Sequence, residues 1–581
     1  MISREFRSLS WSGAGRNLAR MTTRILRTRR LFGAFILGSL ALAGCGHLGS
    51  DPARRADPAA TAAVRPALVV MLVVDGLPMR QVTGYRHQLA PDGFARFLNR
   101  GAWYSDAHYA HAFTVTAAGH ATLLTGAYPH RTGIIGNEWR DPVTGERVYN
   151  TADATAQYIG HKTQALDGTS PRRLKVESLG DVLKRADARS RVIAISGKDR
   201  GAILPAGWSG TAYMYMGETG EFASSTYYMT EHPAWVKAFN AAKPASRYFK
   251  TDWKPALAEA EYAHSLPDDQ PWYGPKGGKL PMRFGADADA APGAPYFASL
   301  LRSPFGDALA LDFARAAIAG EQLGKDDAPD ILSISLSGHD YVNHAFSAES
   351  RLSHDHLIQL DRLLQDFFRH LDETVGAGRY VAVLTADHGF SPAPEYSQQR
   401  GQGGGRLSSG DVQKKLEAGL SQRFGPGRWL LGISGSSLLI DKTAVAARAQ
   451  DLDAVADEAR RLLLAEPGVA AAYTRRELLT GSPAGAPFFE AMRRAWHRDV
   501  SGEVQFALQP GWMFGSTVAT HGSPHVADTH VPILLYGPPW VQPGERAERV
   551  APVDIAPTLA RLLRVAAPAA SEGRVLTGAL R

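Results

Sequence analysis

The chain has 581 residues, of which 44% are hydrophobic and 21% are charged, as in ordinary globular proteins. This composition excludes a disordered, a collagen-like or an integral multi-span membrane protein. The formal net charge of +7 arises in the first 44 residues, where eight arginines accompany the single acid Glu5, so the remainder is neutral. A neutral body lacks the positive charge that attracts nucleic-acid phosphates, and we expect no nucleic-acid binding.

The N-terminal segment has the pattern of an export signal. Arginines at positions 24, 27, 29 and 30 precede an apolar run at residues 31–43, which is too short to span a membrane. The run ends in Leu42-Ala43-Gly44-Cys45, which resembles the lipobox of bacterial lipoproteins. That resemblance implies a lipoprotein signal peptide at residues 1–44 and a lipid anchor on Cys45. The alternative is an ordinary signal peptide followed by an incidental thiol.

The residues around the export signal support further predictions. Residues 45–66, rich in Ala, Pro and Arg, are expected to form a tether. An alternative translation start at Met21 would leave a conventional short basic segment before the apolar run. Cys45 is the only cysteine, so the mature protein has no intramolecular disulfide, and its stability must come from the core and bound metal. We expect a periplasmic or outer-membrane-anchored lipoprotein that touches the membrane only through Cys45.

Five apolar runs predict the strands of a central sheet, at residues 67–74, 191–195, 331–336, 380–385 and 531–537. The first, ALVVMLVV, is apolar at every position, as in a parallel strand covered on both faces. Helical patterns at 307–318 and 352–375 alternate with the runs. The sequence therefore predicts an α/β fold with a doubly wound, mostly parallel sheet and helices on both faces.

Two segments within the catalytic domain expected at residues 67–581 fit this core poorly. Residues 201–293, approximately, are rich in Tyr, Trp, Gly and Pro and have weak periodicity, which predicts a loop-rich insertion over the site. Residues 399–515 begin with the flexible sequence QRGQGGG. A helical segment at 444–465 is predicted there between strands at 436–440 and 469–473.

Polar residues follow four of the predicted strands, at Asp75-Gly76, Lys198-Asp199-Arg200, His339-Asp340 and Asp387-His388. In a doubly wound sheet ligands bind at the carboxyl ends of the strands, so these side chains are expected to converge. Each pair alone is also a common turn sequence. Their repetition after four strands favours a site.

The residue types at these strand ends suit zinc. Asp75, Asp340 and Asp387 supply carboxylates, and His344 and His388 supply imidazoles. A further donor is expected from residues 517–525, where His521 and His525 compete. A single histidine is more often a core or surface residue, but the shared position at strand ends favours metal binding.

Thr116 lies in TVTAAGHATLLTG, which predicts a loop that enters a helix. On periodicity alone the threonine is interpreted as an N-cap. A helix N-terminus also attracts phosphate, because its free N–H groups and dipole favour an anion. A hydroxyl held there against a metal ion can lose its proton and become a nucleophile.

Seven motifs occur in one order: Asp75, Thr116 with Gly119-His120, Asn137 in GIIGNEW, Lys198-Asp-Arg200, Asp340-x-x-x-His344, Asp387-His388-Gly and His521-Gly-Ser-Pro. Together they resemble the alkaline phosphatase superfamily. More narrowly, they are similar to the monomeric, threonine-nucleophile alkaline phosphatases of the PafA and PhoK type, a branch close to the nucleotide pyrophosphatase/phosphodiesterases. The resemblance extends from about residue 67 to the C-terminus.

The resemblance implies two Zn²⁺ ions and a role for each motif. Asp340, His344 and His521 would hold one zinc, while the other would be held by Asp75, Thr116, Asp387 and His388. Thr116 would be the catalytic nucleophile and carry the phosphoryl group. The non-bridging oxygens would be bound by Asn137, Lys198 and Arg200. The implied enzyme is a monomeric alkaline phosphatase acting on small-molecule phosphate monoesters.

Lys198 and Arg200 decide the expected substrate class. A monoester presents a dianionic group with three terminal oxygens, which two cations match, whereas a diester carries one charge and a second organic group. A phosphodiesterase or nucleotide pyrophosphatase on the same scaffold is the first alternative, and a solvated turn is the alternative for this pair. A non-catalytic surface lipoprotein is a further alternative. The cysteine form of the sulfatases is excluded, because no cysteine follows Cys45.

Overall fold

The computed structural model describes residues 65–274, 277–481 and 485–581. The expected signal peptide, Cys45 and nearly all of the expected tether lie outside the described residues. Within the part that is described, no helix combines the length and the apolar character needed to cross a membrane.

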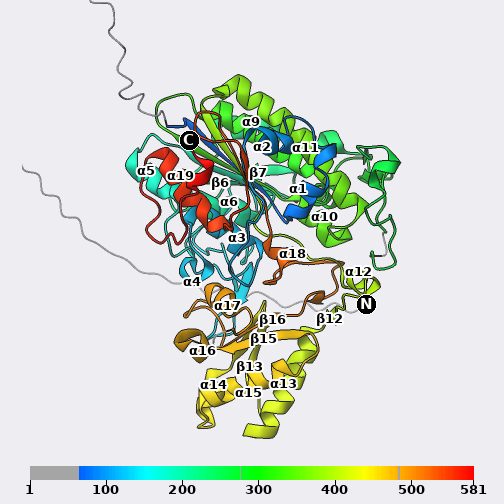
Figure 1. The fold of residues 1–581 in the computed structure, drawn as a ribbon, viewed down its shortest axis with the longest axis vertical. Helices are drawn as coiled ribbons and strands as arrows, with labels where there is room; N and C mark the ends of the chain where they lie inside the picture. The colour runs from blue at the N-terminus through cyan, green and yellow to red at the C-terminus, as the bar shows by residue number, and fades with distance from the viewer. Residues whose placement is uncertain (1–64, 275–276, 482–484) are drawn as a thin grey trace, which may run out of the picture. The chain divides into compact units, whose positions relative to one another are not determined.

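A nine-stranded sheet forms the centre of the described chain, in the order β19-β2-β18-β11-β1-β10-β5-β6-β7 (Figure 1). The five predicted strands are all present, as β1 (Leu68–Val74), β5 (Val192–Ser196), β10 (Asp330–Leu336), β11 (Tyr380–Thr385) and β18 (Ile533–Tyr536). Strand β1 pairs in parallel with both β10 and β11, and β10 pairs in parallel with β5. The predicted α/β fold with a mostly parallel sheet is confirmed.

The outer strands complete this sheet. Strand β18 runs antiparallel to β11, and beyond it lie β2 (Ala102–Tyr104) and β19 (Gly544–Arg546). At the other edge β6 (Thr211–Met216) pairs in parallel with β5, and β7 (Glu221–Ala223) returns antiparallel. These two edge strands fall inside the range predicted as an insertion, so the prediction that it begins near residue 201 is wrong. Tyr213 and Tyr215 of β6, whose sequence is TAYMYM, belong to the same hydrophobic core as Leu72 of β1.

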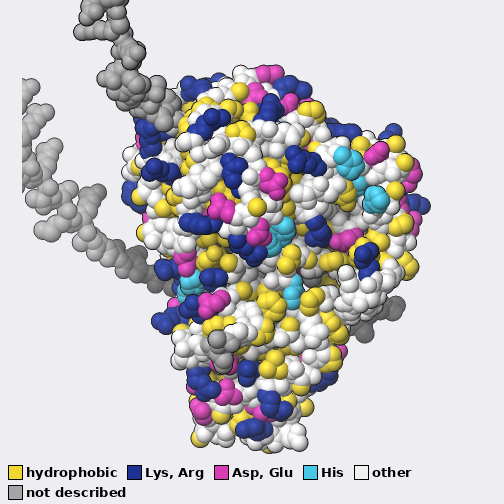
Figure 2. All heavy atoms as spheres, viewed as in Figure 1, with side chains coloured by type: hydrophobic (Ala, Val, Ile, Leu, Met, Phe, Trp, Pro, Cys, Tyr) yellow, Lys and Arg dark blue, Asp and Glu magenta, His cyan; other side chains and the backbone are white. Residues whose placement is uncertain are grey.

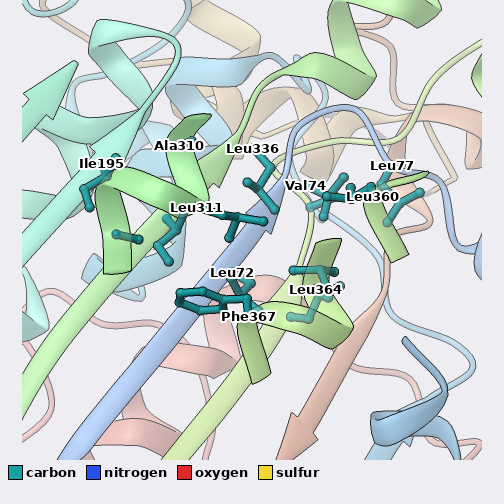
Figure 3. Packing of buried hydrophobic residues seen from close by; sticks show 14 of the residues in the cluster. Leu72, Val74, Leu77, Ile195, Ala310, Leu311, Leu336, Leu360, Leu364 and Phe367 are labelled. Atoms are coloured by element: carbon teal, nitrogen blue, oxygen red, sulfur yellow. The ribbon is translucent and has the colours of Figure 1, made fainter. Parts of the chain in front are cut away.

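Helices cover both faces of the sheet. Leu72 and Val74 of β1 pack on one face against α9 (Pro304–Gly320) and α11 (Arg351–Leu371), as Figure 3 shows for Leu360, Leu364 and Phe367. The intervening residues of β1 pack on the other face against α5 (Leu179–Ala186) and α19 (Ile555–Leu563). Because side chains alternate along a strand, burial of both faces explains why β1 is apolar at every position.

Residues 405–514 form what we call the small lobe. Its four-stranded sheet has the order β13-β14-β16-β15, with β13 (Leu430–Ser434), β14 (Ser437–Ile440), β15 (Val469–Thr474) and β16 (Val504–Leu508). Helix α13 (Ser409–Phe424) and helix α15 (Leu452–Leu464) pack against this sheet around a separate hydrophobic core. Strands β12 (Gly405–Leu407) and β17 (Trp512–Phe514) pair where the chain enters and leaves the lobe.

The prediction of a single helix at residues 444–465 is wrong. The structure has two helices there, α14 (Lys442–Ala447) and α15, separated by a short turn. Ala449 adopts a left-handed backbone conformation with φ of 49°. The Asp451 carboxylate then accepts hydrogen bonds from the backbone N–H groups of Asp453 and Ala454 and starts α15. This N-cap competes with a continuous helix.

The other elements lie mostly in the connections. Strands β3 (Glu138–Arg140) and β4 (Arg147–Tyr149) form one hairpin, and β8 (Thr251–Trp253) and β9 (Met282–Phe284) form another. Helices α3 (Thr116–Thr125), α6 (Asp199–Ala206) and α10 (Gly338–Phe346) lie at the site described below. The remaining α-helices are α1 (Met79–Gly84), α2 (Phe94–Arg100), α4 (Pro129–Thr132), α7 (Ala234–Ala241), α8 (Ala294–Leu300), α12 (Pro394–Gln399), α16 (Arg475–Thr480), α17 (Phe489–Ala495) and α18 (Val526–Thr529).

Candidate active site

Three buried aspartates meet at the carboxyl ends of neighbouring strands. Asp75 directly follows β1, Asp340 lies in the first turn of α10 after β10, and Asp387 follows β11. Since β1 lies between β10 and β11 in parallel, the three strands end at the same edge. The backbone N–H of Gly76 donates to Asp387 Oδ1 over 3.0 Å, which ties the first of these strand ends to the third.

Asp340, His344 and His521 form the first group of potential metal ligands. Asp340 and His344 are four residues apart on α10 and therefore share a helix face. The Nε2 atoms of His344 and His521 lie 3.4 and 3.5 Å from Asp340 Oδ1. One donor atom from each of the three residues lies within 4.8 Å of the other two.

Asp75, Asp387 and His388 form the second group, by the same 4.8 Å criterion. Nε2 of His388 lies 3.5 Å from Asp75 Oδ1 and 3.4 Å from Asp387 Oδ2. The His388 ring also stacks on the His521 ring with their centroids 3.4 Å apart. The two groups are therefore adjacent.

The three histidines present the same ring nitrogen to the site. Nδ1 lies 3.0 Å from Ala519 O in His344, 2.8 Å from Gly389 O in His388 and 2.8 Å from Thr114 O in His521. A carbonyl oxygen only accepts hydrogen bonds, so Nδ1 carries the proton and Nε2 is left with a free lone pair. Metal-ligating histidines have this arrangement, in which a backbone oxygen fixes the tautomer.

The charge balance of the site also fits bound cations. Asp75 Oδ1, Asp340 Oδ1, Asp387 Oδ2 and His388 Nε2 are buried and have no hydrogen-bond partner among the described residues. Lys198 supplies a positive charge to this cluster of carboxylates. Its Nζ lies 2.7 Å from Asp75 Oδ2 and 2.5 Å from Asp340 Oδ2. Burial, together with the Asp387 carboxylate, raises the pKa of Asp75 to about 7. Buried carboxylates in excess over their counterions are costly, and cations would relieve this.

Thr116 is the first residue of α3, and its hydroxyl is free. Val115 is the N-cap, and no side chain caps this helix, so the interpretation of Thr116 as an N-cap is wrong. The helix starts one position earlier than that interpretation requires. Thr116 Oγ1 is buried with no hydrogen-bond partner among the described residues. It is available for chemistry at a helix N-terminus, where an anion is favoured.

Helix α3 is held against Asp387. A Cβ at Gly119 would lie 2.0 Å from Asp387 O, so only glycine allows this approach. Nδ1 of His120 lies 2.8 Å from Thr116 O and 3.3 Å from Asp387 Oδ2, while its Nε2 lies 2.9 Å from Ser335 Oγ. Thr116 is thereby placed beside the second group. The sequence showed His120 as part of a motif but not this linking contact.

The predicted phosphate-binding residues come from two other segments, Asn137 from just before β3 and Lys198 with Arg200 from the start of α6 after β5. Asn137 Oδ1 accepts a hydrogen bond of 2.8 Å from the backbone N–H of Ala117, so this side chain lies at the N-terminus of α3. Lys198 is the N-cap residue of α6 and its ammonium lies between the two groups. Burial lowers the pKa of Lys198, but Asp340 and Asp75 outweigh this and raise it above its ordinary value.

Arg200 is oriented by residues that sequence reasoning missed. Its Nη1 donates to Tyr149 Oη over 3.1 Å, and that hydroxyl donates to Asp199 Oδ1 over 2.5 Å. The backbone N–H of Gly168 donates to the other oxygen of Asp199 over 3.0 Å. Tyr149 ends β4, and no spacing in the sequence relates it to Arg200.

The additional polar residues near the motifs lie outside both groups. His525 Nε2 lies 2.8 Å from Leu508 O and donates to it, so of the two competing histidines it is His521 that joins Asp340. His339 Nε2 faces Gln81 Oε1 at 2.7 Å. Asn343 Nδ2 donates to Gly76 O over 3.1 Å and supports the turn after β1.

Comparison with known proteins gives consistent matches. Residues 69–525 match the family model described as type I phosphodiesterase / nucleotide pyrophosphatase. Alkaline phosphatase PafA of Elizabethkingia meningoseptica is 34% identical over 524 residues, 88% of this chain and 94% of the relative. Alkaline phosphatase PhoK of Sphingomonas sp is 33% identical over 529 residues, 87% and 90% of the two chains. The crystal structure of wild-type PafA matches with a TM-score of 0.83 and 32% identity, covering 89% of this chain and 99% of that chain.

Proposed function

The chain belongs to the type I phosphodiesterase / nucleotide pyrophosphatase family and is an alkaline phosphatase of the PafA type, and we propose that it works through a phosphorylated Thr116 and two zinc ions. The observation that carries the proposal is the pair of adjacent ligand groups with the free Thr116 hydroxyl beside one of them. The non-catalytic alternative is set aside, because the curated relatives at 33–34% identity include alkaline phosphatases PafA and PhoK.

Zinc is the metal that suits this donor set. Histidine nitrogens combined with carboxylates are typical zinc ligands, whereas magnesium and calcium prefer oxygen donors. Zinc ions held by the two groups, with Thr116 as an added ligand of the second, would stabilise the attacking and departing oxygens as Lewis acids and lower the pKa of a bound hydroxyl. Both groups contain three protein donors, which leaves room for an oxygen of the substrate or nucleophile.

The chain's own residues then perform a double displacement. Thr116 Oγ loses its proton and attacks phosphorus, the bond from phosphorus to the alcohol oxygen breaks, and phosphothreonine forms. The departing oxygen takes up a proton and leaves as the alcohol. Water next attacks the phosphothreonine, which releases inorganic phosphate and restores the hydroxyl. Asn137, Lys198 and Arg200 bind the terminal oxygens of the phosphoryl group in both steps, where positioned charge lowers the barrier.

Lys198 and Arg200 support monoesters as the substrates. The Lys198 ammonium already lies within the site between Asp75 and Asp340, so it is within reach of a phosphoryl group bound there. Two cations suit the dianion of a monoester better than the single charge of a diester. A second ester group would also need the space near these side chains, which disfavours the phosphodiesterase alternative.

We further propose that the protein is exported and acts as a monomer. The basic segment, the short apolar run and Cys45 support a lipid-anchored periplasmic protein. Labelling of expressing cells with a radioactive fatty acid tests the anchor, since Cys45→Ser should abolish incorporation. Unchanged labelling would contradict it. Sedimentation analysis of the purified protein tests the monomer.

The enzymatic test compares p-nitrophenyl phosphate with bis-p-nitrophenyl phosphate. Zinc-loaded wild type should hydrolyse the monoester far faster than the diester, and Thr116→Ala should remove nearly all of this activity while the protein stays folded and retains metal. Dominant diester hydrolysis would overturn the monoester assignment. Full activity of Thr116→Ala would overturn the phosphothreonine mechanism.

A further inference from the structure

A cavity of about 310 Å³ lies between the small lobe and the loop that carries His521. From the small lobe it is lined by Ile433, Phe506 and Trp512, and from the catalytic part by Phe113 and residues 520–525. Hydrophobic side chains gather on the surface at the level where the lobe meets the rest of the molecule (Figure 2). The volume is at the lower end of the range for small-ligand pockets, about 300–1,000 Å³.

Phe113 connects this cavity with the catalytic residues. A Cβ at Gly136 or at Gly522 would lie 3.2 Å from the Phe113 ring, and one at Gly435 would lie 2.7 Å from it. The ring therefore fills the space between the residue before Asn137, the residue after His521 and the β13–β14 turn of the small lobe. The cavity wall is continuous with the site.

The proposed displacement decides which side of the site faces the alcohol. An in-line reaction expels the alcohol opposite the nucleophile. Thr116 is held on the Asp387 side through His120, so the departing oxygen lies on the side of Asp340, His344 and His521. The loop of His521 is the part of that side which lines the cavity.

The charge of the lining selects a type of alcohol. No lysine or arginine lines the cavity in the described part of the chain. Its one carboxylate, Asp528, accepts hydrogen bonds from the Ser391 hydroxyl over 2.6 Å and from the Ser523 hydroxyl over 2.6 Å. A second phosphate group would find no cation there, whereas an aromatic ring would contact Phe113, Ile433 and Trp512.

We propose that this cavity is the subsite for the alcohol part of the ester and that it favours aromatic or otherwise apolar alcohols. The inference rests on the proposed function, because it needs the alcohol to leave from the His521 side. A second hollow of about 300 Å³ serves as the comparison. Lys198 and Arg200 form part of its wall, together with other charged residues that include Lys162, Asp167 and Glu218.

The test fills each hollow in turn. Ser409 is exposed at the start of α13 and lines the cavity, and Gln164 is exposed and lines the second hollow. The variants Ser409→Trp and Gln164→Trp are assayed for kcat/KM with 1-naphthyl phosphate and with methyl phosphate. Each value is divided by the wild-type value for the same ester, so that intrinsic reactivity cancels.

Ser409→Trp should lower kcat/KM for 1-naphthyl phosphate about tenfold and change methyl phosphate less than about twofold. Gln164→Trp should leave the ratio of the two esters unchanged. Ile433→Ala, which removes apolar contact from the cavity, should lower the naphthyl value about fivefold. Competitive inhibition by 1-naphthol should weaken in Ser409→Trp, while inhibition by inorganic phosphate should not change.

Three outcomes would overturn the proposal that this cavity is the alcohol subsite. The first is an unchanged ratio of the two esters in both cavity variants, the second is an equal loss for both esters, and the third is a selective loss in Gln164→Trp instead. Failure of the proposed function is recognised separately, because Thr116→Ala would then keep its activity on both esters.

Discussion

The two groups of potential metal ligands and the proposed phosphoryl-binding residues are built on different kinds of support. Asp75, Asp340 and Asp387 follow three adjacent parallel strands whose hydrogen-bonded ladders set their separation. Asn137 and Arg200 depend instead on side-chain hydrogen bonds, Asn137 with the backbone N–H of Ala117 at the start of α3 and Arg200 with Tyr149 of the β3–β4 hairpin. The first region is positioned by the backbone of the core, and the second by a few polar contacts near the surface.

This difference predicts that substitutions in the ligand groups should cost more activity than substitutions of residues that support the phosphoryl-binding side chains. In the ligand groups, loss of one side chain leaves buried carboxylates without compensation, so the cost is large. In the phosphoryl-binding region, a supporting residue such as Tyr149 contributes through one or two hydrogen bonds, each with a modest net value. The predictions below follow this order.

Asp340→Ala should have the largest effect. The variant removes a proposed zinc ligand and also a partner of Lys198. We therefore expect bound zinc to fall and monoesterase activity to drop by about a thousandfold or more. Zinc content and kcat/KM for p-nitrophenyl phosphate measure this. Asp411→Ala, at an exposed position of α13, is the control and should match wild type. Full zinc content with full activity in Asp340→Ala would remove it from the ligand set.

Arg200→Ala should cost about a hundredfold in monoester kcat/KM, because the variant lacks the charged donor that we propose for the transferred phosphoryl group. Unlike Asp340→Ala, it should keep its zinc and should lower the ratio of monoester to diester hydrolysis. Arg185→Ala, on the exposed face of α5, is the matched control. An unchanged ratio would mean that Arg200 does not face the phosphoryl group.

Gly119→Ala tests the rigidity of the strand-end region. The new Cβ would meet Asp387 O at 2.0 Å, so α3 must shift and carry Thr116 with it. We expect kcat to fall by up to about a hundredfold, the cost of a displacement near 1 Å at a reacting group. Gly84→Ala, where a Cβ meets nothing within 4 Å, is the control. Wild-type kcat in Gly119→Ala would show that this packing does not position the nucleophile.

Tyr149→Phe should have the smallest effect. The change removes the hydroxyl that accepts from Arg200 and donates to Asp199, and a hydrogen bond of this kind is worth about 1 kcal/mol, or about fivefold in kcat/KM. The loss should be greater for the monoester than for the diester, as in Arg200→Ala. Tyr227→Phe is the control, because it removes an exposed hydroxyl that donates to Trp208 O, and it should leave kcat/KM unchanged. A thousandfold loss would place Tyr149 in direct contact with the reacting group.

Much of the fold was predictable because buried parallel strands leave a clear pattern. The run at β1 and the four polar strand ends identified both the sheet and the residues that meet at its edge. The misassigned range after residue 201 has a physical reason. Strand β6 (TAYMYM) is rich in Tyr and Met instead of the Val, Ile and Leu of the central strands, and the edge strand β7 has only three residues. The break between α14 and α15 depends on a local cap that periodicity does not register.

The sequence by itself determined the α/β class, the catalytic candidates and the two sets of donor types, because these depend on residue identity and on position after a strand. Only the tertiary structure decided that His521 rather than His525 joins Asp340, that Thr116 has a free hydroxyl, and that Tyr149 orients Arg200. These contacts join residues from separate segments of the chain, and their geometry depends on how the strands, helices and loops pack together, which spacing along one sequence does not encode.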